Sequence, residues 1–398
     1  MLNFPKNAFP AHVDEFLEQL VDGGAQPLSV PKELDNEGAF GAAPLAVQAI
    51  ASWARRPETQ KVQLPDEMGS SDLERANFAA SLVGMGAMYF ADEVEAGPHK
   101  WMRFDALRAV TPYVMAMNRG DFSSASHRRQ AGLVCFAGAR AEFLNPLYAK
   151  PELGAVREAT DFRVLLRRVL KSLDPSLPAQ LNDGQHELLS AMLHQLFQNT
   201  DEHGAFDAEG RKYSRAMRGV FVRLTTLQSI HTLMADVGED VPLKAFLSKA
   251  IVFRPQEQLR SAADGKEASK AGQPLHFLEL SVFDTGPGMA LKWLSKSSGA
   301  RKYDDFSEED ELEALKACFK KHATTKMVQN SGIGLPMALM AMKRLNAFMA
   351  LRTGRMSLYQ DFSAASTDAF DPKPRGGTKE LSAPEIAGTS YTIVFKVN

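Results

Sequence analysis

A polar stripe runs along one predicted helix in the middle of the chain. Gln195, Asn199 and His203 recur at four-residue spacing, so they share one face of that helix. The opposite face is apolar and can pack on a sheet; it contains Leu189, Met192, Leu193 and Leu196. The polar side chains can hydrogen-bond a ligand, although a polar stripe opposite an apolar one is also typical of any surface helix. Its meaning depends on the segments that follow.

A second candidate is a carboxylate at the end of a predicted strand. Residues 278–283 have the pattern of a buried strand, which leads into Asp284 and then Thr285-Gly286-Pro287-Gly288-Met289. A carboxylate here can accept a hydrogen bond from the exocyclic amino group of adenine and so select a purine. The glycines let the backbone approach the base without Cβ collisions. The alternative is an ordinary turn, because Asp, Gly and Pro favour turns.

A glycine-rich turn precedes a further apolar helix that runs through Leu345. The turn is Ser331-Gly332-Ile333-Gly334-Leu335, and it follows His322-Ala323-Thr324-Thr325-Lys326 after a short gap. Such a turn presents free backbone N–H groups and the positive end of the helix dipole to a phosphate. Lys326 adds a positive charge near the terminal phosphate. Glycine that merely caps the helix is the alternative explanation.

In this order the three segments resemble the GHKL ATPases, the superfamily of DNA gyrase B, heat-shock chaperones, histidine kinases and MutL. The N-box of that family is similar to residues 195–199, and its first glycine box is similar to residues 284–288. Its Thr-Thr-Lys segment and second glycine box are similar to residues 324–335. A closing Gly388-Thr389 leads into a strand at 390–397, where the family's domain also ends. The resemblance covers about residues 180–398.

The resemblance implies that ATP and Mg²⁺ bind to these motifs. Asn199 is expected to coordinate the Mg²⁺ that bridges the phosphates, Asp284 to bind adenine, and Thr389 to lie near it. The residues expected to shape the phosphate loops are Gly286, Gly288, Gly332, Gly334 and Leu335. Further nucleotide contacts are expected from His203, Met289, Thr325, Lys326 and Ile333. Residues 289–330 are expected to form a lid, and their acidic run at 307–311 is assigned no chemistry.

The residue at the catalytic position, Gln195, departs from the family pattern. Relatives that hydrolyse ATP unaided commonly place a glutamate four residues before the metal-binding Asn, where it activates water as a general base. An amide cannot accept a proton at neutral pH, although it can orient a water molecule. We therefore expect one of three outcomes: slow hydrolysis, substitution by His194, Asp201 or Glu202, or transfer of the phosphate to another acceptor.

The motifs predict an Mg²⁺-dependent ATP-binding protein that acts as a slow ATPase or an ATP-gated regulatory switch. The alternative is a protein kinase with the same ATP site, either a histidine autokinase or a serine kinase of the anti-sigma-factor type. An autokinase needs an acceptor histidine; His127 is a loosely suggestive candidate, whereas His186 lies in the metal-binding helix itself. A module that senses ATP without catalysis is a third possibility.

The overall pattern predicts an α+β fold, in which residues 181–398 form an α/β sandwich of the GHKL (Bergerat) type. Strand-like and helical segments alternate in residues 1–100, an order that is faintly similar to STAS domains; the segments are 26–31, 44–53, 61–64 and 73–88. Residues 101–180 have a helical period and are expected to connect the two parts. The later segments include a helix from Gln185 to about Glu202, which Asn182 or Asp183 caps and Gly204 ends, and strands at 219–224 and 275–284.

Composition excludes few functions but limits the partners. The formal net charge is −2, so the chain has no general attraction for nucleic acid or for an anionic membrane. Cys135 and Cys318 lack the spacing of a zinc site or a disulfide framework, which fits a reducing cytoplasm. The N-terminus lacks a signal-peptide pattern, and no apolar run approaches the length of a membrane span. The expected partner besides ATP is a protein or a second copy of the chain.

Overall fold

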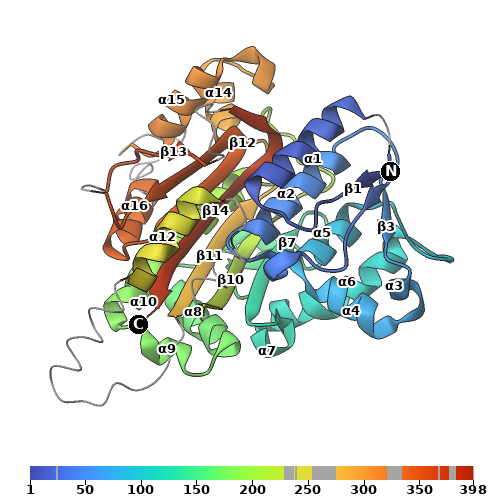
Figure 1. Ribbon diagram of the computed structural model, residues 1–398, viewed down its shortest axis with the longest axis horizontal. Coiled ribbons are helices and arrows are strands. Elements are labelled where there is room, and N and C mark those ends of the chain that lie inside the picture. The colour runs from blue at the N-terminus through green and yellow to red at the C-terminus, as the bar shows by residue number, and fades with distance from the viewer. Residues whose placement is uncertain are drawn as a thin grey trace.

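Two sheets organise the chain, and helices cover both faces of the larger one (Figure 1). The computed structural model describes residues 1–23, 26–227, 237, 240–252, 275–320, 334–365, 368–375 and 382–397. The fold is a mixed α+β fold with one mixed sheet and antiparallel sheets, as the sequence predicts at this level.

The N-terminal quarter of the chain forms a five-stranded sheet with the order β1-β2-β3-β4-β5. The first four strands are parallel, and the last pair is antiparallel. The strands are β1 (Leu2–Asn3), β2 (Leu28–Ser29), β3 (Lys61–Leu64), β4 (Glu93–Ala96) and β5 (His99–Met102). The helices between them are α1 (Pro10–Asp22), η1 (Asp35–Gly38), α2 (Ala42–Ala54), α3 (Glu67–Ser70), α4 (Asp72–Ala80) and α5 (Leu82–Phe90).

The predicted alternation of strands and helices in this quarter is confirmed, with one difference. Strand β3 occupies residues 61–64 as predicted, but the single helical segment predicted at 73–88 is divided into α4 and α5. The division falls at Ser81, which has extended backbone angles and whose hydroxyl accepts a hydrogen bond of 3.0 Å from the N–H of Gly84. A serine in this geometry begins a new helix, because its side chain satisfies one of the free N–H groups.

The larger sheet has seven strands in the order β13-β12-β14-β11-β10-β7-β6, and every neighbouring pair is antiparallel. The strands are β6 (Ser126–His127), β7 (Gln130–Phe136), β10 (Met217–Leu227), β11 (Leu275–Asp284), β12 (Phe348–Asp361), β13 (Lys373–Pro374) and β14 (Ser382–Val397). The predicted strands at 219–224, 275–284 and 390–397 are confirmed within β10, β11 and β14.

Strands β6 and β7 belong to the segment for which the sequence predicts only helices. They form a hairpin whose two central residues, Arg128 and Arg129, both have positive φ, at 49° and 59°. Two-residue hairpin turns of this kind are usually recognised by Asn-Gly or Gly-Gly. An Arg-Arg turn gives no such signal, so the sequence does not reveal the hairpin. Strand β7 lies before residue 180 and pairs with β10 beyond it.

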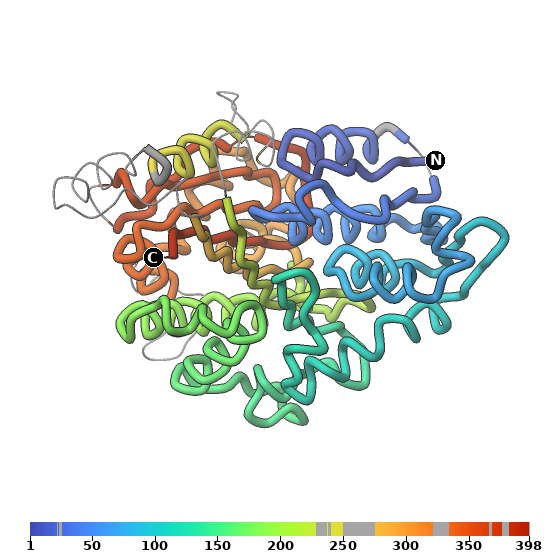
Figure 2. Tube along the Cα trace, turned by 60° about the horizontal axis from the view of Figure 1, so that its bottom comes forward, coloured from blue at the N-terminus to red at the C-terminus, as the bar shows by residue number. Residues whose placement is uncertain are grey.

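Helices lie on both faces of the seven-stranded sheet (Figure 2). One face carries α8 (Ala159–Leu173), α10 (Asp183–His203) and α16 (Gly334–Arg344), and the other carries α1, α2 and α12 (Val241–Val252). Strand β11 is buried at nine of its ten residues, as expected for a strand covered on both sides. Helix α2 thus joins the N-terminal quarter to the larger sheet.

Two further helices rise from the end of β11, in the segment expected to form a lid. They are α14 (Met289–Ser297) and α15 (Glu308–Cys318), with the short η3 (Tyr303–Asp305) between them. The remaining elements are α6 (Arg103–Arg119), α7 (Phe122–Ala125), β8 (Tyr148–Lys150), η2 (Pro151–Leu153), β9 (Ala155–Val156) and α9 (Leu177–Gln180). Within the described ranges, no helix has the length and apolar character needed to cross a membrane.

Candidate functional site

Helix α10 presents the predicted polar stripe. A capping box starts the helix: the Asn182 side chain accepts from the N–H of Gln185, and the Gln185 side chain accepts from the N–H of Asn182. The apolar residues listed above are buried, whereas Gln195, Asn199 and His203 are partly exposed. The helix ends at Gly204, so its predicted bounds and both faces are confirmed.

The stripe meets the beginning of α16. Gly334 is the first residue of α16, and a Cβ placed on it would lie 2.4 Å from Oε1 of Gln195. The next residue, Leu335, is buried in the first turn of the helix. The structure therefore brings Gln195 together with Gly334 and Leu335. Thr325, Lys326, Gly332 and Ile333 lie outside the described residues.

Asp284 is the last residue of β11 and lies beside the C-terminal end of α10. A Cβ on Gly204 would lie only 2.4 Å from Cβ of Asp284, so the helix end and the carboxyl-bearing residue are in direct contact. Asp284 is 5% exposed, and its Oδ1 accepts a hydrogen bond of 2.7 Å from the N–H of Gly286. The N–H of Thr389 donates to the same carboxylate.

Burial has a large effect on the acidity of Asp284. It raises the pKa of this carboxyl to about 7, although the two backbone donors and the charges of Arg55 and Arg218 act in the opposite direction. A close cation would lower the pKa of a buried carboxyl, so the raised value shows that no such ion pair compensates for the burial of Asp284. Carboxyls with strongly shifted pKa values cluster at functional sites. Asp284 can accept a hydrogen bond from a ligand N–H that takes the place of water.

A chain of contacts connects the remaining predicted residues. The Asn199 side chain hydrogen-bonds Tyr391 of β14, and the Tyr391 hydroxyl donates to the sulfur of Met289 at 2.8 Å. The N–H of Met289 donates to the Thr353 hydroxyl at 3.0 Å, and that hydroxyl is 3.0 Å from the Thr389 hydroxyl. Asn199, Met289 and Thr389, which are far apart in sequence, are thus linked through Tyr391 and Thr353.

Two glycines beside Asp284 and Thr353, Gly388 and Gly288, have backbone conformations and contacts that a side chain would disturb. Gly288 has φ +87°, and a Cβ on it would lie 2.3 Å from the Tyr303 hydroxyl. Gly388 has φ +76°, and its Cβ would lie 2.0 Å from the backbone oxygen of Asp284. Close packing, rather than a capping preference alone, therefore accounts for glycine at both positions.

A scan of protein-family models found no match, and searches of curated proteins and of solved structures found no significant match. The interpretation of the site therefore depends on its own geometry and on the motifs that it brings together.

The three residues considered as substitutes for a catalytic glutamate lie on the other flank of α10. His194, Asp201 and Glu202 line a cavity with Gln198 and the loop at 154–158. Asp201 accepts from Nε of the buried Arg218 at 2.8 Å and from the Tyr148 hydroxyl.

The His194 side chain packs against Phe162, not against Gly334, the residue that lies beside Gln195. Its ring packs edge-on against Phe162 at 5.2 Å, and burial lowers its pKa. Its Nδ1 is 3.3 Å from Nε2 of the neighbouring Gln195, so the two side chains are within hydrogen-bond distance. Neither Asp201 nor His194 therefore projects as an independent base toward the site.

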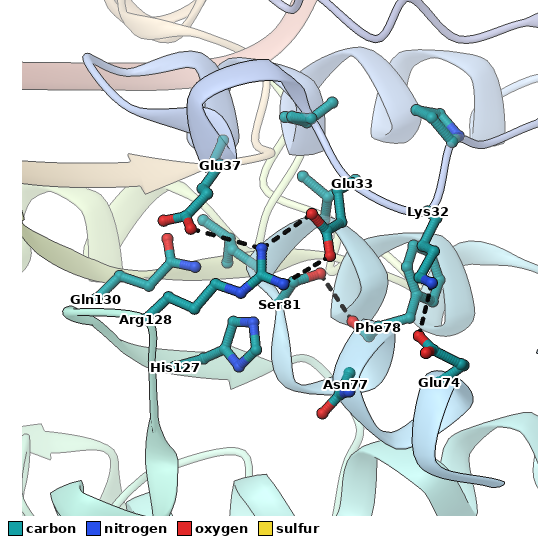
Figure 3. Close-up of a pocket in the computed structure, with 15 residues that line it drawn as sticks. Lys32, Glu33, Glu37, Glu74, Asn77, Phe78, Ser81, His127, Arg128 and Gln130 are labelled. Carbon is teal, nitrogen blue, oxygen red and sulfur yellow. Dashed lines mark hydrogen bonds and ion pairs between the residues drawn. The ribbon is translucent and has the colours of Figure 1, made fainter. Parts of the chain in front are cut away.

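The two histidines considered as phosphate acceptors also lie elsewhere. His186 is buried, with Nε2 2.9 Å from the carbonyl oxygen of Pro178. His127 lines a pocket at the β6–β7 hairpin, beside the ion pairs that Arg128 makes with Glu33 and Glu37 (Figure 3). Since β6 is three strands from β11 and strands are about 4.8 Å apart, His127 is more than about 14 Å from Asp284.

Two residues of the expected lid, Tyr303 and Glu311, are held to the rest of the fold by hydrogen bonds. The Tyr303 hydroxyl donates to the carbonyl oxygen of Pro287 at 2.8 Å. Glu311, from the acidic run that was assigned no chemistry, is fully buried and accepts from both the N–H and Nε of Arg355 at 2.9 Å. This contact holds α15 against β12, which is a structural role.

Sequence reasoning missed the contribution of the N-terminal quarter to the site. The Arg55 guanidinium, at the end of α2, donates to the backbone oxygens of Thr285 and Gly286. The contact joins residues about 230 positions apart, so no local pattern could have indicated it. Tyr391 and Thr353 were missed because their contacts also join distant parts of the chain. Tyr391 lies in the predicted strand at 390–397, and Thr353 lies in β12, a strand that was not predicted.

Proposed function

We propose that the chain is an Mg²⁺-dependent ATP-binding protein with a site of the GHKL type, which works as a slow ATPase or an ATP-gated switch. The observation that carries the proposal is the linked set Asn199, Tyr391, Met289, Thr353 and Thr389, which lies next to Asp284. The segments similar to the N-box, the first glycine box and the closing Gly388-Thr389 meet in space, and this supports an α/β sandwich of that type.

Each side chain has a role that its surroundings permit. The Asp284 carboxylate accepts from the amino group of adenine, since its present hydrogen bonds come from backbone groups beside it. The Asn199 amide oxygen is a suitable hard ligand for Mg²⁺. Bound Mg²⁺ would neutralise phosphate charge. The start of α16 at Gly334 lies against Gln195, and the free backbone N–H groups of a helix N-terminus suit an anion.

Slow hydrolysis follows from the residues at the catalytic position. Gln195 can orient water but cannot take its proton, and Asp201 is held by Arg218 and Tyr148. The absence of a glutamate at position 195 also supports a second candidate function, phosphoryl transfer to a hydroxyl or imidazole of another protein. His127 is too distant to serve as an acceptor in the same molecule without rearrangement.

Calorimetric titration of the full chain with nucleotides tests the proposal. ADP with Mg²⁺ is expected to bind, and GDP is expected to bind much more weakly, because guanine presents a carbonyl oxygen where adenine presents an amino group. Chelation of Mg²⁺ should weaken ATP more than it weakens adenosine. If the folded full chain binds neither ADP nor ATP, the proposed function is wrong.

A labelled-phosphate assay separates the two candidate activities. The full chain is incubated with γ-labelled ATP, and free phosphate is separated from phosphate bound to protein. Slow release of free phosphate supports the ATPase, whereas label on the chain or on an added protein fraction supports the kinase. ATP binding without either product supports the switch.

A further inference from the structure

Helix α2 contacts the candidate site through one face. Gln48, Ser52 and Arg55 are spaced at i, i+4 and i+7, so their side chains point the same way from the helix. Nε2 of Gln48 donates to the carbonyl oxygen of Ala387 at 3.0 Å, and the Ser52 hydroxyl accepts from the N–H of Ala387 at 2.8 Å. Arg55 donates to the Thr285 oxygen and, at 2.7 Å, to the Gly286 oxygen.

The two backbone segments held in this way lie on either side of Asp284. Thr285 and Gly286 follow it directly, while Ala387 precedes Gly388, which packs on the Asp284 backbone oxygen. The next residue, Thr389, donates its N–H to the Asp284 carboxylate. One face of α2 therefore fixes both of the segments whose N–H groups orient this carboxylate.

Arg55 is itself held in place. Its guanidinium lies over the ring of Tyr213, 4.5 Å from the ring centroid, and Tyr213 is tied to the end of α10 by a 3.0 Å hydrogen bond from its N–H to the Ala205 oxygen. A guanidinium has a planar set of donors that can bind two neighbouring carbonyl oxygens while stacked on an aromatic ring. Lysine offers one charged nitrogen and cannot reproduce this arrangement.

We infer that α2 is an integral wall of the nucleotide site, and that Arg55 is the positioning residue that sets the Asp284 carboxylate for purine binding. The inference rests on the proposed function, and it extends the site beyond residues 181–398 into the N-terminal quarter. It also makes the N-terminal quarter the part of the chain through which nucleotide binding can be coupled to a partner, because movement of α2 moves both segments beside Asp284.

The charges around Asp284 give the inference a distinctive readout. The titratable and charged groups that act on this carboxyl are Arg55 of α2, Tyr213, Arg218 of β10 and Tyr391 of β14. The positive charge of Arg55 lowers the pKa of Asp284, against the effect of burial. Loss of Arg55 should therefore raise that pKa and move the pH at which nucleotide affinity declines to a higher value.

The test is calorimetric titration of the full chain with ADP and Mg²⁺ from pH 5.5 to 8.5, at temperatures well below unfolding. Arg55→Gln is expected to weaken ADP about tenfold at neutral pH, which corresponds to about 1.4 kcal/mol, and to shift the pH profile upward. Arg55→Lys should restore the charge effect but little of the affinity. Ser52→Ala, a milder change on the same face, should weaken ADP a few-fold.

Arg56→Gln is the matched control. Arg56 also donates to backbone oxygens, those of Leu20 and Gly23, but both lie in the N-terminal quarter. It should lower the unfolding temperature without changing ADP affinity or its pH profile. If wild type binds ADP and Arg55→Gln binds it equally well with the same pH profile, the inference is overturned while the proposed function stands. If wild type does not bind, both are wrong.

Discussion

The two flanks of helix α10 carry similar polar side chains but have different surroundings. On one flank, Asp201 is held by the buried Arg218 and the Tyr148 hydroxyl. On the other, Gln195 faces the glycine at the start of α16, and Asn199 leads to Asp284 through a series of neutral groups. A matched ion pair marks one flank, here called the paired flank, whereas neutral groups, close glycines and a carboxyl of raised pKa mark the other, here called the open flank, for which we propose a ligand.

The largest expected effect comes from placing a carboxylate on the open flank. Gln195→Glu should raise phosphate release by about 10²–10⁴-fold if only a general base is missing. If wild type instead labels a protein, the change should divert phosphate to water. Gln198→Glu is the matched control, because it makes the same change on the opposite flank. Equal phosphate release by both variants would remove the distinction between the flanks.

The next largest effect is a loss of stability on the flank where Asp201 pairs with Arg218. Arg218→Met leaves Asp201 without its main cation, and loss of one member of a buried ion pair costs about 3–5 kcal/mol of unfolding free energy. Urea unfolding measures the loss. Arg301→Met, at a side chain that is 77% exposed, should change stability very little. A similar small loss for Arg218→Met would mean that the ion pair does not hold this flank.

A smaller effect is expected at the carboxyl of the open flank. Asp284→Asn replaces an acceptor oxygen by an amide nitrogen donor, which leaves the adenine amino group poorly paired. ADP affinity should fall by about 1–3 kcal/mol, which is about 5–150-fold. Asp105→Asn, on the exposed surface of α6, is the control. Undiminished affinity in a variant that melts normally would contradict the purine-selecting role.

A comparable effect is expected on the pH dependence of stability. Because the folded-state pKa of Asp284 is about 7 and its ordinary value is 3.8, the folded state binds the proton more tightly than the unfolded state. The stability from this proton is fully present below the ordinary pKa of 3.8 and is lost as pH rises from there through about 7. Between pH 5 and pH 8, wild type should lose about 2–3 kcal/mol more than Asp284→Asn. Parallel urea-unfolding curves for the two proteins across this range would contradict the raised pKa.

Local patterns in the sequence predicted the helix and the strand that carry Asn199 and Asp284. The four-residue spacing of α10, its Asn182 cap and the strand at 275–284 depend on neighbouring residues, and the structure has them at or within two residues of the expected bounds. The division at Ser81 and the Arg128-Arg129 hairpin were missed, because serine and arginine occur in many other settings.

The contacts that complete the site could not be predicted in this way. Arg55 reaches the glycine box across about 230 residues, and the partnership of Asp201 with Arg218 requires α10 and β10 to be packed first. The spacing of residues in a single sequence does not indicate which distant residues contact each other. From the sequence alone, the polar residues of both flanks of α10 therefore appeared equally able to bind a ligand or act as a base.

The N-terminus of α2 has a consequence for the time course of biosynthesis. Its N–H groups at Phe40 and Gly41 donate at 2.6 and 2.9 Å to the carboxylate of Glu279, 238 residues beyond Gly41. At about 5–20 residues per second, the ribosome needs about 10–50 s to supply that carboxylate. During this interval the face of α2 that packs on β11 and β14 has no partner, so we expect this apolar face of the nascent N-terminal quarter to stay exposed until those strands are made.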